Sequence, residues 1–274
     1  MSDKHASAYS DHILRHYRSE AELFGSDASS TMRDETTRAR EIAAIHRLFD
    51  HVRSLNKGAK DVVDIGCGNG FLLERLRVHA PDVALTGLEY TPEMVEIARK
   101  RNVSGCTVTQ GDVRELPFPD ASFDLAITER CIINVMDRDD QARSLREVAR
   151  ILRPGGYFIC IEAFMDGLDA LNEARAELGL EPNAVAHHNI WFDKQWFLDT
   201  IKPVFEVAEL DENADPPLPT PNFLSSHYFI SRVLYPSVTK REIIYNTHFV
   251  KFFGFLPPIG NYSAIQIYLL KKQG

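Results

Sequence analysis

The chain has 274 residues, of which 44% are apolar, so it can bury a sizeable core in one large domain. Its formal net charge of -8 argues against nucleic acid as a partner, because binding to a phosphate backbone requires clustered lysine and arginine. We find no signal peptide and no apolar run of the roughly 18 residues that a membrane span needs. We therefore expect a cytoplasmic protein without a membrane partner.

Helical spacing marks two stretches before residue 56. Ile13, Leu14 and Tyr17 follow helical spacing, and a longer helix is predicted over about 40–55. Asp34 precedes the longer helix and suits its N-cap.

From residue 56 onward, strand-like apolar runs alternate with helical periodicity. Strands are predicted at about 61–65, 84–89, 106–109, 123–128, 156–162, 204–210 and 263–270. Helices are predicted between them, at about 70–79, 92–101, 138–152 and 193–202. This alternation indicates parallel pairing through crossover helices, and therefore an α/β fold with a doubly wound, seven-stranded, mostly parallel sheet.

The turn after the first strand reads Asp64-Ile-Gly-Cys-Gly-Asn-Gly70. Glycines in such a turn let a nucleotide-like ligand approach bare backbone at a helix N-terminus. An acidic residue at the end of the second strand, here Glu89, can accept hydrogen bonds from both ribose hydroxyls. Three more features follow the later strands: Gly111-Asp-Val113, Glu129-Arg130, and Leu152-Arg-Pro-Gly-Gly156, a helix stop with a tight turn.

Two segments exceed what this scaffold needs. The first, residues 163–192, contains His187, His188 and Trp191. The second, residues 211–262, begins rich in proline and continues rich in aromatic residues. Long irregular segments in a compact domain are usually functional or disordered. Because the second segment is too aromatic for disorder, we expect it to fold as a cover over a substrate pocket.

These motifs resemble those of class I S-adenosylmethionine-dependent methyltransferases, in the same order, over about residues 60–165. The resemblance implies a Rossmann-like fold with an antiparallel last strand and S-adenosylmethionine as the cofactor. It also implies one domain over 1–274, with a helical lid at 1–55 and a cofactor-binding core at 59–165. The residues implied for cofactor binding are Arg38, Asp64, Gly66, Cys67, Gly68, Gly70, Glu89, Tyr90, Asp112, Val113 and Glu129.

The resemblance also distributes the parts of the cofactor among these residues. The three glycines face the methionine moiety, with Asp64 orienting their loop and Arg38 near the methionine carboxylate. Glu89 holds the ribose. Tyr90 flanks the adenine, and Asp112 with Val113 holds its amino group and ring.

A dinucleotide-binding dehydrogenase has a similar glycine turn and acidic strand end. Its fingerprint needs glycine or alanine at the sixth position, for close helix–strand packing and a pyrophosphate. Phe71 occupies that position, which argues against an NAD(P)-dependent oxidoreductase. A non-catalytic protein that binds S-adenosylmethionine is the other alternative.

Methyl transfer needs mainly proximity and alignment, and it needs a base when the acceptor is a hydroxyl. The candidate bases are His187, His188, Glu129 and His227, since histidine titrates near neutrality and Glu129 follows the fourth strand. Candidates for binding the acceptor are Arg130, Asn134, Glu162, Trp191 and Tyr228. Packing, a helix cap or an internal ion pair is the alternative role for each of these side chains.

The four cysteines, Cys67, Cys106, Cys131 and Cys160, form no CxxC pair, so neither a zinc site nor a disulfide framework is indicated. We expect no metal. The expected function is transfer of a methyl group to an oxygen, or a nitrogen, of a small organic acceptor, in secondary metabolism or glycan modification. The oligomeric state, a homodimer included, stays open.

Overall fold

The computed structural model describes residues 18–19, 32–211, 214–243, 245–254 and 256–274. The predicted helical spacing at 13–17 lies outside these residues. The first long helix that is described, α2 (Glu35–Leu55), begins earlier than residue 40. Its start is fixed by Asp34, whose side chain accepts a hydrogen bond from the Thr37 N–H at 3.0 Å.

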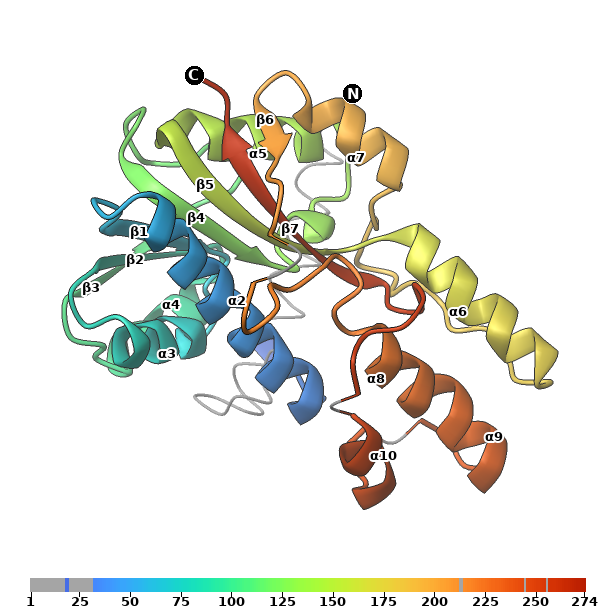
Figure 1. The fold of residues 1–274 in the computed structure, drawn as a ribbon. Helices are drawn as coiled ribbons and strands as arrows, with labels where there is room; N and C mark the ends of the chain where they lie inside the picture. The colour runs from blue at the N-terminus through green and yellow to red at the C-terminus, as the bar shows by residue number, and fades with distance from the viewer. Residues whose placement is uncertain (1–17, 20–31, 212–213, 244, 255) are drawn as a thin grey trace.

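A seven-stranded sheet in the order β3-β2-β1-β4-β5-β7-β6 forms the centre of the molecule (Figure 1). Its strands are β1 (Asp61–Ile65), β2 (Ala84–Glu89), β3 (Cys106–Gln110), β4 (Phe123–Glu129), β5 (Leu152–Ala163), β6 (Phe205–Val207) and β7 (Ile265–Lys272). Strands β1 to β5 pair in parallel, whereas β7 runs antiparallel to both β5 and β6. The predicted doubly wound sheet and its antiparallel last strand are confirmed.

Helices cover both faces of the sheet, so successive residues of one strand are buried in different cores. Val62 lies in the cluster that includes α2 and α3 (Phe71–His79), and Val63 lies in the cluster that includes α5 (Arg138–Ile151) and α7 (Lys194–Ile201). The helix α4 (Pro92–Lys100) connects β2 to β3. Burial on both faces explains why the strands read as continuous apolar runs.

The start of β5 differs from the prediction. Helix α5 ends at Ile151 as expected, but residues 152–156 belong to the strand instead of forming a separate tight turn. The pairing with β4 is irregular between Phe123 and Leu125, and Gly155 has a φ of 73°. The glycine pair therefore makes an irregularity inside the strand. The edge strand β6 is shorter than the predicted 204–210.

Both inserts contain helices that were not predicted. The first contains α6 (Met165–Glu177). The second contains α8 (Ser225–Phe229), a π-helical turn at Ile230–Leu234, α9 (Tyr235–Thr239) and α10 (His248–Phe253). In Figure 1 these helices stand outside the layers that cover the sheet. The second insert is therefore folded, while its role as a cover over a substrate pocket and the limits 1–55, 59–165, 163–192 and 211–262 remain predictions.

Two contacts fix the inserts to the rest of the chain. At Gly167 of α6, an added Cβ would lie only 2.0 Å from the carbonyl oxygen of Ser263, next to the start of β7. The second insert meets α2 through Arg40, which donates to the carbonyls of Phe223 and Leu256 at 3.1 and 3.0 Å. Among the described residues, no helix is long and apolar enough to cross a membrane.

Candidate active site

The glycine loop between β1 and α3 is the foundation of the site. Gly66, Gly68 and Gly70 all have left-handed backbone, with φ of 79°, 52° and 77°. This conformation disfavours residues with a Cβ. An added Cβ at Gly66 would lie 2.8 Å from Cys131 Sγ, and one at Gly70 would lie 3.2 Å from Ala98 Cβ. Packing against Cys131 thus excludes a Cβ at Gly66, and at Gly70 the tight contact adds to the strain of a left-handed backbone, in addition to any role toward a ligand.

A cavity opens at the carboxyl ends of β1, β2 and β4, where ligands bind in open α/β sheets. Its empty volume is about 1020 Å³, a value that includes the open solvent at its mouth. Nine of the eleven predicted cofactor-binding residues line it: Arg38, Gly66, Cys67, Gly68, Glu89, Tyr90, Asp112, Val113 and Glu129. The substrate candidates Arg130 and Asn134 also line it.

Glu89 ends β2 at the cavity wall. One carboxylate oxygen accepts from the Gly68 N–H at 3.0 Å, and the other accepts from the Thr91 N–H at 2.8 Å. Burial raises the pKa of Glu89 above its usual value, against the opposing effect of these backbone donors. The contacts tie the acidic strand end directly to the glycine loop.

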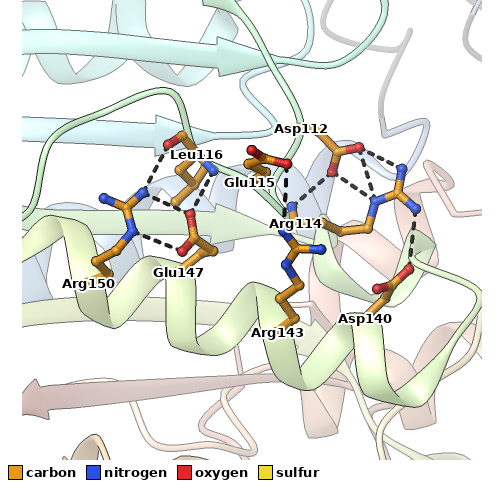
Figure 2. Close-up of polar contacts among 8 residues, drawn as sticks. All are labelled: Asp112, Arg114, Glu115, Leu116, Asp140, Arg143, Glu147 and Arg150. Atoms are coloured by element: carbon orange, nitrogen blue, oxygen red, sulfur yellow. Dashed lines mark hydrogen bonds and ion pairs between the residues drawn. The ribbon is translucent and has the colours of Figure 1, made fainter.

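Asp112 and Val113 lie on a loop that is tied to α5 by arginine–carboxylate contacts (Figure 2). Arg114 donates to both oxygens of Asp112 and, at 3.3 Å, to Asp140 of α5. Two further links from α5 hold the next residues: Arg143 lies 3.6 Å from Glu115, and Glu147 accepts from the Leu116 N–H at 2.9 Å. The Asp112 carboxylate is thus oriented before any ligand arrives.

Asp64 and Gly70, the other two predicted cofactor residues, do not line the cavity. Asp64 is buried beneath the glycine loop, and among the described residues its Oδ2 has no hydrogen-bond partner. Burial raises the pKa of Asp64 well above its usual value, and nearby Glu129 and Glu89 add to this effect. Gly70 is the N-cap of α3, where it packs against Ala98.

Two ion pairs join α2 to the end of β4. Arg38 lies 3.4 Å from Glu129, and Arg130 contacts Glu41. Glu41 is fully buried, which raises its pKa to about 7 against the opposing charge of Arg130. Arg130 has a φ of 55°, an uncommon value for a residue other than glycine that Asn102, Ala121 and Lys240 also show.

The other two polar candidates near this strand end have distinct positions. Asn134 donates to the Arg130 carbonyl at 2.7 Å and accepts from Asn189 of the first insert at 2.7 Å. Glu162 is fully buried and accepts from the N–H groups of Cys131, Ile132 and Ile133. Burial raises the pKa of Glu162 to about 7 despite these donors. Glu162 caps the 3₁₀ turn Ile132–Asn134 from behind the cavity wall.

None of the three histidines proposed as bases is among the described residues that line the cavity. His187 is exposed and His188 is half-buried, and their rings contact each other. His227 is fully buried and lies 2.8 Å from Asp34, the residue that caps α2. Of the four candidate bases, Glu129 lines the cavity, and its catalytic role stays a prediction.

Neither aromatic candidate is among the described residues that line the cavity. Trp191 packs against the core cluster of α5 and α7, and its carbonyl accepts from Arg138 at 2.6 Å. Tyr228 is buried beneath the guanidinium of Arg232, 3.5 Å from its ring centre, and burial raises its pKa to about 12.

Glu41, which contacts Arg130 of the cavity lining, is not predicted by the sequence. A single glutamate on a long helix carries no sequence signal, because its burial depends on which face of α2 meets the end of β4. Several further lining residues lie in or beside the predicted motifs and are not among the predicted site residues: Asn69, Leu72, Leu88, Thr91, Arg114, Cys131 and Val135.

The residues of the cavity fit S-adenosylmethionine. The apolar side chains Leu88 and Val113 suit a base ring, and the carboxylates of Glu89 and Asp112 are acceptors for hydroxyl and amino groups. Burial raises the pKa of the Cys67 and Cys131 thiols well above the usual range, so neither is a ready nucleophile. Among the described residues, no cluster of histidine, cysteine or acidic side chains could hold a metal ion.

Comparison with known proteins identifies the same part of the chain. A family model described as a methyltransferase domain matches residues 62–156. A fatty-acid O-methyltransferase of Mycolicibacterium smegmatis is 37% identical over 108 residues, which are 38% of this chain and 37% of that protein. A demethylmenaquinone methyltransferase of Deinococcus radiodurans is 32% identical over 112 residues, 40% of this chain and 45% of that protein. The chain thus spans less than half the length of these curated relatives.

The fold is shared over a longer stretch. A chain of the solved complex of the Trm112 methyltransferase activator from Haloferax volcanii is 22% identical, with a TM-score of 0.52, over 88% of this chain and 93% of its own length. At this identity the similarity supports the fold alone. The motifs from the glycine loop to the start of β5 fall within the matched segment, so residues 62–156 match a methyltransferase domain.

Proposed function

We propose that this protein transfers the methyl group of S-adenosylmethionine to an oxygen, or a nitrogen, of a small organic acceptor. The observation that carries the proposal is the convergence of the glycine loop, Glu89, Asp112 and Glu129 on one cavity at the carboxyl ends of the parallel strands. S-adenosylmethionine supplies an activated methyl group, so the protein has to bind and align the reactants.

The cofactor-binding roles follow from the contacts of these residues. Glu89 accepts hydrogen bonds from hydroxyl groups, while its own contacts with Gly68 and Thr91 keep its carboxylate in place. Asp112, oriented by Arg114, accepts from the adenine amino group beside the apolar Val113. Arg38 offers positive charge for the methionine carboxylate.

The acceptor binds on the side of the cavity formed by Glu129, Arg130 and Asn134. Asn134 is hydrogen-bonded to Asn189 of the first insert, and the Ile190 N–H donates to the Ile133 carbonyl at 2.9 Å. These two contacts support the idea that the first insert helps to select the acceptor. The name of the Mycolicibacterium smegmatis relative supports oxygen as the methylated atom.

Calorimetry with S-adenosylmethionine tests the first half of the proposal. Gly68 has left-handed backbone at the cavity wall, so Gly68→Arg fills the site and should weaken binding by about 100-fold or more, in a protein that stays folded. Gly179→Arg is the matched control, because Gly179 also has left-handed backbone, with a φ of 66°, but faces open space. Equal affinity in both variants would refute the assignment of the loop.

Release of S-adenosylhomocysteine across a panel of acceptors tests the second half. A binding protein without activity would take up S-adenosylmethionine and release no product. An NAD(P)-dependent oxidoreductase would instead bind reduced nicotinamide dinucleotide, which fluorescence detects. Either result, found with the full chain, would replace the proposed function.

A further inference from the structure

We propose that Arg130 binds the carboxylate of the methyl acceptor and that Glu41 is the positioning residue that holds its guanidinium at the cavity wall. This inference rests on the proposed function, because it assigns the acceptor class of the same cavity. The product would be a methyl ester.

The position of Arg130 is imposed on the chain at a cost. Its left-handed backbone, directly after β4, turns the chain into the 3₁₀ turn Ile132–Asn134 while keeping the Arg130 N–H on the Ile161 carbonyl at 2.7 Å. Its side chain is only 16% exposed, yet it lines the cavity. A guanidinium on such a rigid base is well suited to planar, two-point recognition of a carboxylate.

Glu41 has the properties of a residue that is kept for its effect on Arg130. It is fully buried on α2, and its second oxygen, Oε2, has no hydrogen-bond partner among the described residues. A buried carboxyl group is expensive, and an apolar side chain of the same size would often stabilise a protein more. What Glu41 contributes is a fixed direction for the Arg130 guanidinium.

Two of the carboxylates that line the cavity, Glu129 and Asp112, are themselves paired with arginines. The neighbouring carboxylate of Glu129 lies within 3.4 Å of Arg38, which offsets its negative charge. Asp112 is likewise paired with Arg114. An anionic acceptor is also attracted by the positive charge of the methyl donor, and this attraction strengthens in a cavity with apolar walls.

The carboxylates of the cavity are poorly placed to serve as bases, which also favours an acceptor that is already ionised. Glu89 accepts from two backbone N–H groups, Asp112 from Arg114, and Glu129 from Arg38. No histidine is among the described lining residues. A hydroxyl acceptor would need a base, whereas a carboxylate at neutral pH does not.

Methyl transfer to a carboxylate balances in atoms and charge without a base. A carboxylate oxygen of the acceptor forms the new bond to the methyl carbon as the carbon–sulfur bond breaks, and the electron pair of that bond stays on sulfur. The products are a neutral methyl ester and S-adenosylhomocysteine. No proton is released, whereas a hydroxyl or ammonium acceptor would release one proton per turnover.

The first test is equilibrium binding to the full chain loaded with S-adenosylhomocysteine, using two matched pairs of probes: octanoate with octanamide, and benzoate with benzamide. At least one carboxylate should bind ten times or more tightly than its amide. Arg130→Gln should abolish this preference, and Arg130→Lys should restore part of it. Arg53→Gln is the matched control, because Arg53 is also paired with a carboxylate, Asp82, but on the surface of α2.

Glu41→Gln tests the positioning role. It should raise the KM of the preferred carboxylate about tenfold with a smaller change in kcat, and leave the affinity for S-adenosylmethionine as it was. Glu35→Gln, on the exposed face of the same helix, is the control for a general effect of a lost charge. If Glu41→Gln kept the wild-type KM and preference for the carboxylate over its amide, Glu41 would not position Arg130.

Three results would overturn the inference while the proposed function stands. The wild-type protein could bind S-adenosylmethionine but prefer no carboxylate of the panel over its amide. The preference for a carboxylate could survive in Arg130→Gln, or methyl transfer could release one proton per turnover. A loss of S-adenosylmethionine affinity in Arg130→Gln as large as in Arg38→Gln would assign Arg130 to the cofactor instead. A wild-type protein that binds neither S-adenosylmethionine nor S-adenosylhomocysteine would refute the proposed function itself.

Discussion

The cofactor-binding region at 62–156 and the two inserts are built in different ways. In the first, the site consists mostly of strand ends and backbone turns, such as the left-handed glycines and the N–H groups that hold Glu89. In the second, helices are attached to the rest of the chain through the half-buried Arg40 of α2, the buried pair of Asp34 and His227, and one close backbone contact before β7. Strand ends and turns therefore position most of the first region, with contacts from α5 holding its Asp112 loop, whereas the second depends mainly on particular side-chain pairs.

The largest expected effect is at the contact between α6 and the backbone before β7. Gly167→Ala places a methyl group 2.0 Å from the Ser263 carbonyl oxygen. Because that oxygen belongs to the backbone, the clash can be relieved only if α6 or the segment before β7 moves. We expect a loss of about 3 kcal/mol or more in the free energy of unfolding, measured in urea. Asp169→Ala, on the exposed side of the same helix, should change it by less than about 0.5 kcal/mol. Equal stabilities would mean that the first insert is not held by this contact.

The next effect concerns Asp34, which joins the second insert to α2 through His227 and, at 3.6 Å, Arg232. Burial alone would raise the pKa of Asp34, but the hydrogen bond from His227 and the charge of Arg232 outweigh it and lower the pKa to about 2. Because the folded value lies below the unfolded one, the ionised carboxylate stabilises the fold above about pH 4. This contribution disappears as the pH falls from about 4 towards 2.

Asp34→Asn keeps the shape and the capping ability of the side chain but removes its charge. At pH 7 it should cost about 2 kcal/mol of unfolding free energy, and the difference from wild type should shrink towards pH 2. Urea titrations at pH 7, 5 and 3 measure this trend. A difference that is independent of pH would contradict the role of the charge.

A smaller effect is expected in the cofactor-binding region. Asp112→Ala removes an acceptor from the cavity wall and should weaken S-adenosylmethionine binding about tenfold, with little change in stability because the carboxylate is partly exposed. Asp120→Ala, on the exposed part of the same connection between β3 and β4, is the control. Calorimetry on both proteins would sharpen the contrast with Asp34, where stability changes and cofactor affinity should not.

The smallest effect is expected at Lys251, which pairs with Glu35 at 2.8 Å across the same α2–insert boundary as Asp34 but in solvent. Exposed ion pairs contribute little, so Lys251→Ala should change the unfolding free energy by less than about 0.5 kcal/mol. A loss of unfolding free energy as large as that of Asp34→Asn would show that exposed ion pairs also attach the second insert to α2.

The difference between strand-end positions and long-range side-chain pairs also explains which parts of the fold and the site could be predicted from the sequence. Strand ends and turns such as Gly66–Gly70 and Glu89 recur at fixed spacing because the parallel sheet fixes their positions, so both fold and cavity residues followed from local patterns. Helix α6 contains good helix formers, but Gly167 and a long expected insert obscured it. Glu41 and His227 depend on contacts between residues far apart in the chain, and no local pattern records those contacts.

The place of β7 has a consequence for the order in which the chain folds. β7 lies between β5 and β6 in the sheet but follows the second insert in the sequence. During synthesis, β5 keeps an open edge and β6 has no neighbouring strand until the ribosome has made the whole insert. An unpaired strand edge is a template for association with other chains. The speed with which the aromatic insert folds therefore bears on how much nascent protein escapes aggregation.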